Sequence, residues 1–448
     1  MTTAAVEHVI RAPRAVIDGE VRPAAIGLAD GVIRVIGEVD SHLGGAGETV
    51  LGPDVVLLPG LVDTHVHIDD PGTDWEGFDS ATAAALAGGI TTVVDMPLDC
   101  DPVTTTVPAL EVKRSAARGA CHVDTGFWGG IVPDNLESFG ELAGAGVLGF
   151  KCFLSESGNA DFPPLDPDQL RAAMAVVAEL DSVLLVHAES ERVLTDCPAP
   201  AGRSYGEFLR SRPDAAERDA VRIVLDAVAE TGARAHIVHV SSAEVLPMLA
   251  EAKAAGLPVT AETCPHYLTF AAEAIPEGAT VFAACPPIRG GDNRTLLWAA
   301  LADGTLDMVV SDHSPCAPRH KDLTGGDFGR AFGGISSLQI ALPALWTQAR
   351  RLGFDVRDVC RWMAQAPAGL AGLTDRGLIA EGKRADFCVF EPDASWVVRG
   401  AELRHRHPVT PYEGSVLTGA IRQMWRAGRV AGHDSHGDLL VAGLREPA

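Results

Sequence analysis

The pattern of apolar and polar residues divides this chain into three parts. Residues 6 to 58 alternate short apolar runs with turn residues, which predicts a small β-rich segment. Within it, Asp30-Gly31 separates two apolar runs and predicts a hairpin, because Asp-Gly tolerates the positive φ of a tight primed turn. From Pro59 onward, apolar strands alternate with amphipathic helical stretches, which is typical of repeated βα units around a parallel sheet. After Thr374 the pattern of short strands returns.

Eight strand candidates follow one another in the middle part of the chain. They cover residues 61–67, 91–97, 122–131, 147–154, 182–189, 234–242, 258–268 and 307–315. Helical stretches lie between them, such as 166–180 and 214–232, each opened by a residue that favours helix capping. Eight strands that alternate with helices predict an α/β fold, a (β/α)8 TIM barrel over residues 59–374. Since the termini of a domain often lie close together, residues 1–58 and 375–448 are expected to form one small β-sandwich domain.

Composition narrows the class of protein. Of 448 residues, 47% are hydrophobic and 21% are charged, as in an ordinary globular protein with a large core. The formal net charge of −24 opposes the counterion release that drives nucleic-acid binding, so no nucleic-acid partner is expected. The nine cysteines do not form a disulfide framework, and no apolar run is long enough to span a membrane. These features predict a cytoplasmic protein without a membrane partner.

Metal-binding residue types recur where the barrel strands are expected to end, which is where barrel enzymes place their active sites. In the first strand His65 and His67 are two residues apart, so both imidazoles project from one face. The other candidates, near the ends of later strands, are Lys151, His187, His239 and Asp312. A single histidine at a strand end more often makes ordinary hydrogen bonds. Four histidines and an aspartate in the same phase instead favour a divalent metal site.

Lys151 stands between apolar strand residues, where burial disfavours the charged form of a lysine. It could pair with a buried acid, form a Schiff base, or add carbon dioxide and become a carbamate that bridges two cations. The surrounding histidines favour the carbamate. Asp312 could serve as a metal ligand and also as a general base.

Other reactive residue types lack a supporting pattern. No G-x-S-x-G or phosphate-binding G-x-x-x-x-G-K-[ST] motif is present, and Cys152 beside the candidate lysine is interpreted as a packing residue. The remaining histidines are expected on the solvated surface, including the pairs His405/His407 and His433/His436.

The chain also carries an ordered set of longer motifs. They are PGLVDTHVH, GFKCF, LLVHAE, IVHVSS, AETCPHYL, CPPIR, SDHSP and GLIAEGKRADFCVF. With these motifs the chain resembles the cyclic amidohydrolases of the amidohydrolase superfamily, the group that contains allantoinase, hydantoinase, dihydropyrimidinase and dihydroorotase. Within that group, WEGF, DMPL, GFKCFLSESG, SDHSPC and FGGISSLQ are similar to allantoinase segments. Asp69 stands where dihydroorotases usually carry a substrate-binding arginine, and Asp99 stands where allantoinases commonly have an asparagine.

The resemblance implies a role for each candidate. His65 and His67 with Asp312 would hold one divalent metal ion, and His187 and His239 would hold a second. Lys151, as N6-carboxylysine, would bridge the two ions together with a hydroxide. Zinc is the first expectation for the metals, with cobalt, manganese and iron as alternatives. Asp312 would be the catalytic acid and base, and the implied substrate contacts are Ser155, Ser157, Cys285, Gly333 and Gly334.

The activity implied by the resemblance is hydrolysis of the ring amide of allantoin to give allantoate. The alternative is a hydantoinase or dihydropyrimidinase that acts on 5-substituted hydantoins or dihydropyrimidines. A non-catalytic binding or assembly relative is a third reading, although such proteins typically lose metal ligands that this chain retains. The expected partner is a small cyclic ureide, and the expected assembly is a homo-oligomer, with a tetramer placed before a dimer.

Overall fold

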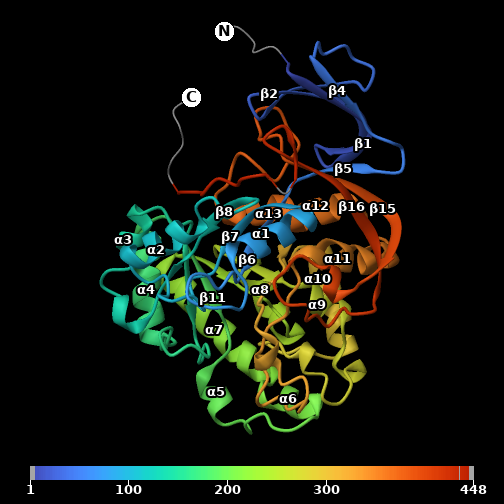
Figure 1. Ribbon diagram of the computed structural model, residues 1–448. Helices are drawn as coiled ribbons and strands as arrows, with labels where there is room; N and C mark the ends of the chain where they lie inside the picture. Colours follow the sequence, from blue (N-terminus) through green and yellow to red (C-terminus); the bar gives the residue numbers. More distant parts are fainter. Residues whose placement is uncertain (1–5, 433, 443–448) are drawn as a thin grey trace.

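The computed structural model describes residues 6–432 and 434–442, and it consists of a large α/β barrel with a smaller β lobe above it (Figure 1). The predicted barrel is confirmed. No helix within the described ranges combines the length and the apolar character needed to cross a membrane.

Eight parallel strands form the barrel. They are β6 (Leu61–Val66), β7 (Ile90–Asp95), β8 (Asp124–Phe127), β10 (Phe150–Phe153), β11 (Val183–His187), β12 (Arg234–Ile237), β13 (Val259–Thr263) and β14 (Met308–Val309). The two-residue strand β9 (Gly129–Gly130) follows β8 and pairs with β10, which joins the sheet β6–β7–β8 to the sheet β9 to β14. The N–H of His67 donates to the carbonyl of His313 at 2.8 Å and closes the ring between the first and last strands.

Helices cover the outside of the barrel. The longer ones are α1 (Phe78–Ala87), α2 (Val107–Ala117), α4 (Pro167–Glu179), α7 (Asp214–Thr231), α8 (Leu246–Ala254), α10 (Gly291–Asp303) and α11 (Ala341–Ala349). The short ones are α3 (Gly140–Gly144), α5 (Glu191–Thr195), α6 (Tyr205–Ser211), α9 (Pro265–Thr269), α12 (Val356–Cys360) and α13 (Ala366–Leu370). Local sequence sets their ends: Asp166 caps the first turn of α4 with its side chain, and Gly232 ends α7 with φ 70°. Because helices cover their outer face, the barrel strands are buried on both sides, including polar residues such as Asp63 and His65.

Strands from both ends of the chain form the β lobe. They are β1 (His8–Ile17), β2 (Glu20–Ala29), β3 (Val32–Gly37), β4 (Gly47–Val50), β5 (Val56–Pro59), β15 (Phe387–Val397), β16 (Val416–Arg426) and β17 (Arg429–Ala431). Strand β5 pairs with β1 on one side and with β15 on the other, so it joins the two chain ends in one sheet. Side chains such as Ile10, Leu57 and Trp425 share one apolar core. The predicted small β domain built from both chain ends is therefore confirmed. The domain boundaries at residues 58 and 375 stay predictions.

The hairpin between β2 and β3 has the predicted turn. Asp30 and Gly31 have φ values of 53° and 74°, and Ala29 pairs with Val32. Two positive φ angles are what a primed two-residue turn requires. The hairpin predicted from Asp-Gly is therefore confirmed.

The barrel strands are shorter than predicted; the strand predicted over 234–242, for example, ends at Ile237. The strand predicted over 258–268 ends at Thr263, and Pro265 begins the helix α9. A proline has no N–H for a sheet and suits the first turn of a helix, so the prediction is wrong for this stretch. In the strand predicted over 307–315, regular pairing ends at Val309, because the chain turns at Asp312 with φ 45°.

Candidate active site

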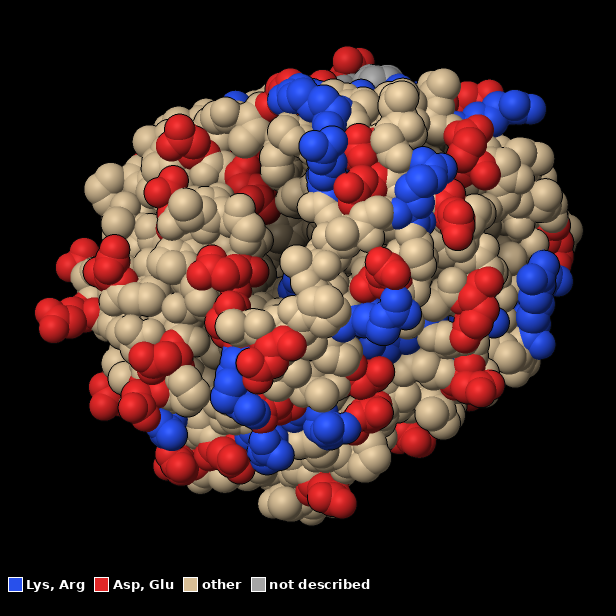
Figure 2. Space-filling view, turned by 90° about the horizontal axis from the view of Figure 1, so that it is seen from below, with Lys and Arg blue, Asp and Glu red and all other residues tan. Residues whose placement is uncertain are grey.

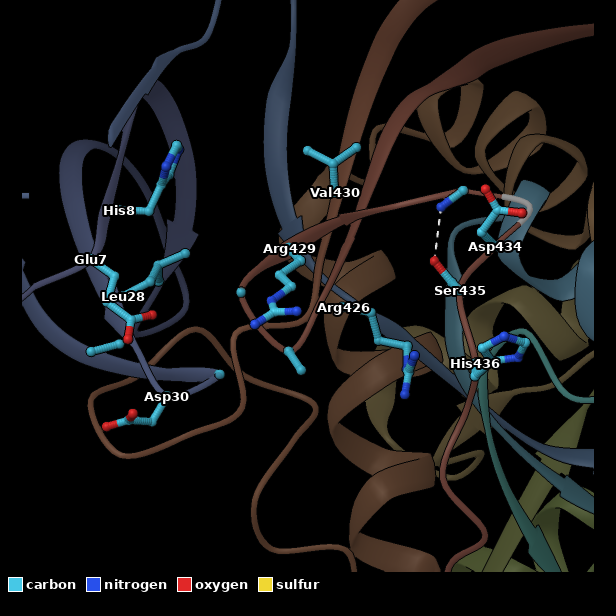
Figure 3. Close-up of a pocket in the computed structure, with 15 residues that line it drawn as sticks. Glu7, His8, Leu28, Asp30, Arg426, Arg429, Val430, Asp434, Ser435 and His436 are labelled. Carbon is cyan, nitrogen blue, oxygen red and sulfur yellow. Dashed lines mark hydrogen bonds between the residues drawn. The ribbon is translucent and has the colours of Figure 1, made fainter. Parts of the chain in front are cut away.

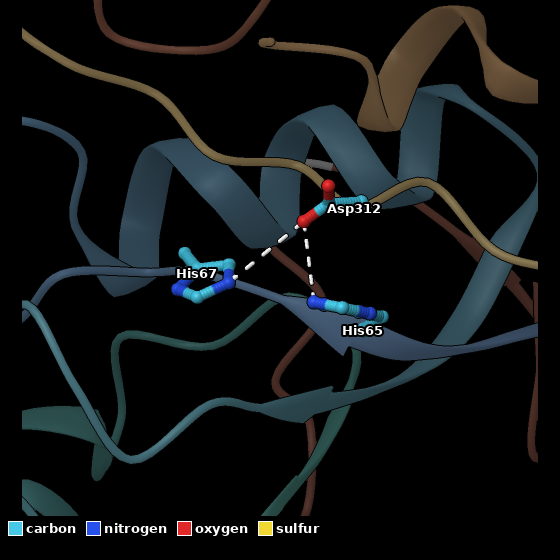
Figure 4. Close-up of side chains that lie close together, drawn as sticks. All are labelled: His65, His67 and Asp312. Carbon is cyan, nitrogen blue, oxygen red and sulfur yellow. Dashed lines mark ion pairs between the residues drawn. The ribbon is translucent and has the colours of Figure 1, made fainter. Parts of the chain in front are cut away.

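A buried cluster of two imidazoles and a carboxylate lies at the carboxyl end of β6. The Nε2 atoms of His65 and His67 are 3.2 and 3.8 Å from Oδ1 of Asp312 (Figure 4). The ligand atoms of these three residues all lie within 4.8 Å of one another, and each residue is less than 9% exposed. The two histidines share a face because they are two residues apart at the strand end. This arrangement suits a divalent metal ion, with two nitrogen donors and one oxygen donor.

The other two histidines form a second pair beside this cluster. Nδ1 of His187 and Nε2 of His239 are 2.9 Å apart, close enough for both to reach one cation at about 2.1 Å. The ring centroids of His65 and His239 are 5.3 Å apart, so the two groups face each other. Lys151 on β10 is 1% exposed, and its Nζ lies 4.8 Å from the ring centroid of Phe153.

The electrostatic surroundings suit neutral imidazoles and a neutral amine. Burial lowers the pKa values of His67 and His239 well below the usual value and that of His187 to about 4. Neutral imidazole is the form that binds a metal. Burial also lowers the pKa of Lys151 to about 8, which raises the fraction of neutral amine, the form that adds carbon dioxide. Burial raises the pKa of Asp312, so its charged form is disfavoured until a cation lies beside it.

Two buried glutamates orient these histidines, and the sequence analysis did not identify either. Nδ1 of His65 donates to Glu262 at 2.5 Å, and Nε2 of His187 donates to Glu189 at 2.8 Å. Each bond leaves the opposite ring nitrogen with its lone pair toward the cluster. Arg212 donates to both carboxylate oxygens of Glu189, which holds that side chain in place. Glu262 could have been noticed in the sequence, because it lies within a strand predicted to be buried and acids are rarely buried without a partner.

The donor set therefore fits divalent metal ions. Four histidines, a carboxylate and a buried lysine converge at the carboxyl ends of five strands. Burial favours the neutral form of His67, His187 and His239, and glutamates orient the rings of His65 and His187. The structure brings together all six residues predicted as ligands. Their roles as ligands and the carbamate on Lys151 stay predictions.

Three segments that are far apart in the sequence meet beside this cluster. Glu76 of the WEGF segment lies 3.4 Å from Nε2 of His313, and both side chains are buried. Nδ1 of His313 accepts from the N–H of Ser337 in the FGGISSLQ segment at 3.0 Å. The rings of Trp75 and Phe332 pack edge to face, with their centroids 4.7 Å apart. The WEGF, SDHSPC and FGGISSLQ segments thus form one wall of the site.

Two aspartates lie on another side of His67. Asp69 is 2% exposed, and neither of its carboxylate oxygens has a hydrogen-bond partner among the described residues. Its ligand atom lies within 4.8 Å of those of His67 and Asp99. Burial raises the pKa of Asp69 well above its usual value and that of Asp99 to about 6. This side of the site therefore offers oxygen acceptors.

The residues predicted to contact substrate have different surroundings. The hydroxyl of Ser155 is buried and has no partner among the described residues, whereas that of Ser157 donates to the carbonyl of Phe162 in its own loop at 2.7 Å. Gly333 packs against Cys285 so closely that an added Cβ would lie 2.5 Å from its Sγ. Gly334 follows in the same loop. Their contacts with a substrate stay predictions.

The expectation that His405 lies on the surface is wrong. Its side chain is 5% exposed, and its ring centroid lies 5.9 Å from that of His313. The N–H of Arg406 donates to Glu76 at 2.9 Å, so this segment covers the WEGF loop. The polar residues around His405 do not predict this burial, because the segment around His405 packs against residues that are 330 positions earlier in the sequence. His436 is exposed as expected, and His433 lies outside the described residues.

A large pocket elsewhere has no connection with this chemistry. It has a volume of about 730 Å³ and lies between the β1–β3 hairpins and residues 426–436, with His8, Asp30 and Arg429 in its lining (Figure 3). None of the predicted site residues lines it.

The lower face of the molecule has a hollow of its own. The helices α5 and α6, which follow the carboxyl end of β11, lie at the bottom of Figure 1. The view from below shows a hollow near the middle of that face (Figure 2).

Comparison with known proteins agrees with the barrel and its metal cluster. The profile of the Amidohydrolase family matches residues 56–431, which include all six predicted ligands. The chain belongs to the amidohydrolase family. Membership confirms the family predicted from the motifs, and it covers both the barrel and strands of the β lobe.

Relatives within this family are similar over almost the whole chain. A protein named allantoinase from Streptomyces avermitilis is 50% identical over 425 residues, which are 94% of this chain and 95% of the relative. An allantoinase from Saccharomyces cerevisiae is 43% identical over 85% of this chain and 84% of the relative. Among solved structures, the L-hydantoinase (dihydropyrimidinase) from Arthrobacter aurescens matches with a TM-score of 0.89 and 27% identity, over 98% of each chain.

Proposed function

We propose that this protein hydrolyses the ring amide of allantoin to give allantoate. One observation carries the proposal: the WEGF, SDHSPC and FGGISSLQ segments converge on one wall of the site. The identity of 50% to a relative named allantoinase, over nearly all of both chains, supports the same substrate.

The six predicted ligands would hold two divalent metal ions, with zinc first and cobalt, manganese or iron as alternatives. His65, His67 and Asp312 would form one set and His187 with His239 the other, and Lys151, as a carbamate, would supply further oxygen donors. Such ions supply a nucleophile from water at neutral pH and polarise the carbonyl that is attacked. Glu262 and Glu189 hold the imidazole rings in the orientation that this binding needs.

Asp312 would carry the proton through the reaction. Its carboxylate takes a proton from the attacking water as the carbon–oxygen bond forms at the ring carbonyl. It then delivers this proton to the ring nitrogen as the carbon–nitrogen bond breaks. The ring opens to a carboxylic acid, which loses its proton to solvent, and a terminal ureido NH2 group. Ser314 donates to Oδ1 of Asp312 at 3.1 Å and restrains this side chain.

The aspartate pair beside His67 argues against an anionic substrate. A carboxylate substituent on the ring, as in dihydroorotate, would lie near Asp69 and Asp99, which supply no positive charge to pair with it. Allantoin instead carries an uncharged ureido group with N–H donors. The unpartnered oxygens of Asp69 are suitable acceptors for such a group.

A substrate panel tests the proposal. Purified protein loaded with metal and bicarbonate is incubated with allantoin, 5-methylhydantoin, dihydrouracil and dihydroorotate, and ring opening is measured for each. We expect the highest kcat/KM for allantoin and none above background for dihydroorotate. Absence of ring opening with allantoin, in protein shown to contain two metal ions, would refute the assignment.

Hydantoinase or dihydropyrimidinase activity is the second candidate. It is favoured by the similarity of the whole chain to the L-hydantoinase structure, although the identity of 27% is well below that to the allantoinases. Faster opening of 5-methylhydantoin than of allantoin would select it. A non-catalytic relative would bind neither metal nor any of these rings, so metal analysis by mass spectrometry tests that reading.

Compartment and assembly are further parts of this proposal. All nine cysteines are free thiols, which supports a reducing compartment such as the cytoplasm. A homotetramer is proposed, with a dimer as the alternative, on the basis of the family resemblance. Light scattering of the metal-loaded protein measures the assembly directly.

A further inference from the structure

Lys321 is a buried lysine that lies outside the metal cluster, in the segment between β14 and α11. It is 3% exposed, and its Nζ donates to the carbonyls of Ala283, Phe332 and Gly334 at 3.1, 2.8 and 2.5 Å. Among the described residues, the ionisable groups that interact with it are the thiols of Cys316 and Cys285 and the imidazole of His266, with no carboxylate among them. A lysine is rarely buried without an acidic partner, so a set of carbonyl oxygens in place of an acid calls for a functional explanation.

The three carbonyls belong to the two loops that carry the predicted substrate contacts. Gly333 lies between two of the acceptors and packs against Sγ of Cys285. Ala283 is two residues before Cys285, so the third carbonyl belongs to the loop on the other side of that contact. Lys321 therefore ties together the two loops where they meet.

The direction of each carbonyl fixes the direction of the next N–H. In a trans peptide the C=O and the following N–H point to opposite sides. With the carbonyls of Phe332 and Ala283 turned toward Lys321, the N–H groups of Gly333 and Ala284 point away from it. Neither N–H donates to an acceptor within residues 6–432 and 434–442. Glycine has no side chain that would restrict this peptide unit, so the ammonium group supplies the restraint.

The same loop is attached to the strand end that carries the predicted general base. The N–H of Ser314 donates to the carbonyl of Ile335 at 3.0 Å, and His313 and Ile335 form a parallel bridge. An added Cβ on Gly334 would lie 2.5 Å from the carbonyl oxygen of Ser314. The loop is thus held between Lys321 and the segment that follows Asp312, which brings Gly333 near the strand end that carries the predicted general base.

We propose that Lys321 is a positioning residue, which orients the N–H groups of Gly333 and Ala284 as donors to the carbonyl oxygens of a cyclic ureide. This inference rests on the proposed function, because it assigns these loops to binding of the ring. In this proposal Lys321 affects substrate binding, whereas a lysine that only linked the two loops would affect stability alone.

The variant Lys321→Met removes the three donors and keeps the length of the side chain. We expect KM for allantoin to rise about tenfold, the loss expected for two weakened hydrogen bonds, while kcat changes less than about threefold. Metal content should stay at the wild-type level, since no predicted ligand contacts Lys321. Lys321→Gln keeps two N–H donors and should give an intermediate KM, and it decides the question if the methionine variant does not fold.

Lys253→Met is the matched control. Lys253 also binds a backbone carbonyl, that of Gly304 at 3.1 Å, but it acts beside Asp307 at the amino end of β14. Its loss should leave KM unchanged. A KM within twofold of wild type in both Lys321 variants, or an equal rise in Lys253→Met, would overturn the proposal. If the wild-type protein opens a different ring from the panel, the proposed substrate is wrong and the same comparison is made with that ring.

Discussion

Replacing Glu262 by glutamine tests whether a carboxylate behind the ligands prepares the site for metal. Glu262 is fully buried and accepts three hydrogen bonds: from Nδ1 of His65 at 2.5 Å, from Nε2 of His236 at 2.9 Å and from the N–H of His239 at 3.3 Å. Burial raises the pKa of Glu262, but the nearby His65 and His236 lower it further, so the net shift is downward and the side chain is a carboxylate. It orients one member of each predicted metal set.

The expected magnitude follows from these three bonds. Glutamine keeps one acceptor oxygen and places an NH2 group against a donor, so one or two bonds are lost. At about 1.5 to 3 kcal/mol for each bond to a charged group, the free energy of unfolding should fall by about 1.5 to 6 kcal/mol. Loss of an outer partner of a metal-bound histidine typically weakens metal affinity by about 10- to 100-fold.

Two measurements separate these effects. Urea unfolding of the metal-free protein gives the stability change, and competition with a chelator gives the metal affinity. Glu217→Gln is the matched control, because Glu217 is equally buried and accepts from Arg289, Ser241 and Ser242 but contacts no predicted ligand. If Glu262→Gln binds metal as tightly as the Glu217 variant, the carboxylate does not prepare the site and this reasoning is wrong.

Three further predictions concern single residues. Lys151→Ala should lower both metal affinity and activity. Each should fall by more than the roughly 100-fold that is lost when a residue that hydrogen-bonds a metal ligand is removed. An active variant without the lysine would exclude a bridging carbamate. Asp312→Asn should reduce kcat by about 100- to 10,000-fold in protein that still contains metal, as measured by steady-state kinetics with parallel metal analysis. Asp124→Asn should lower the free energy of unfolding at neutral pH by about 3 kcal/mol in urea titrations, because it leaves buried arginines without their partner. Burial raises the pKa of Asp124, but Arg384 and two other arginines lower it further, so its stabilisation is present at neutral pH and is lost as the pH falls below 3.8. The two proteins should therefore converge in stability in acid.

The fold and the metal cluster could be predicted because both follow from short-range patterns. The alternation of strands and helices identified the barrel, and a spacing of two residues was enough to place His65 and His67 on one face of a strand. Motif residues at the ends of later strands indicated the other predicted ligands, which the structure brings near this pair. The Asp-Gly turn between β2 and β3 was equally local, because its geometry depends on two residues alone.

What could not be predicted depends on contacts between distant segments. Glu189 follows His187 by two residues, but its role depends on Arg212, which arrives after an insertion that contains α5 and α6. His405 is buried because a late segment folds over the WEGF loop. Lys321 stands in a polar stretch like an ordinary surface residue, since its three carbonyl partners belong to loops on either side of it in the sequence. In each case the sequence shows the residue but not the distant residue that it contacts.

Backbone conformation links the site to the fold that supports it. His239 and Asp312 have φ values of 39° and 45°, in the left-handed region that non-glycine residues rarely adopt and that costs about 1 to 3 kcal/mol each. The bond from the N–H of His239 to Glu262 and the bond from Ser314 to Asp312 help to offset this cost without any metal. The same glutamate that orients the ring of His65 thus also holds the strained backbone of His239. Because these restraints come from protein groups alone, we expect the fold to prepare the geometry of the predicted ligands before a metal ion binds. Metal affinity should then depend also on residues such as Glu262 that do not contact the ion.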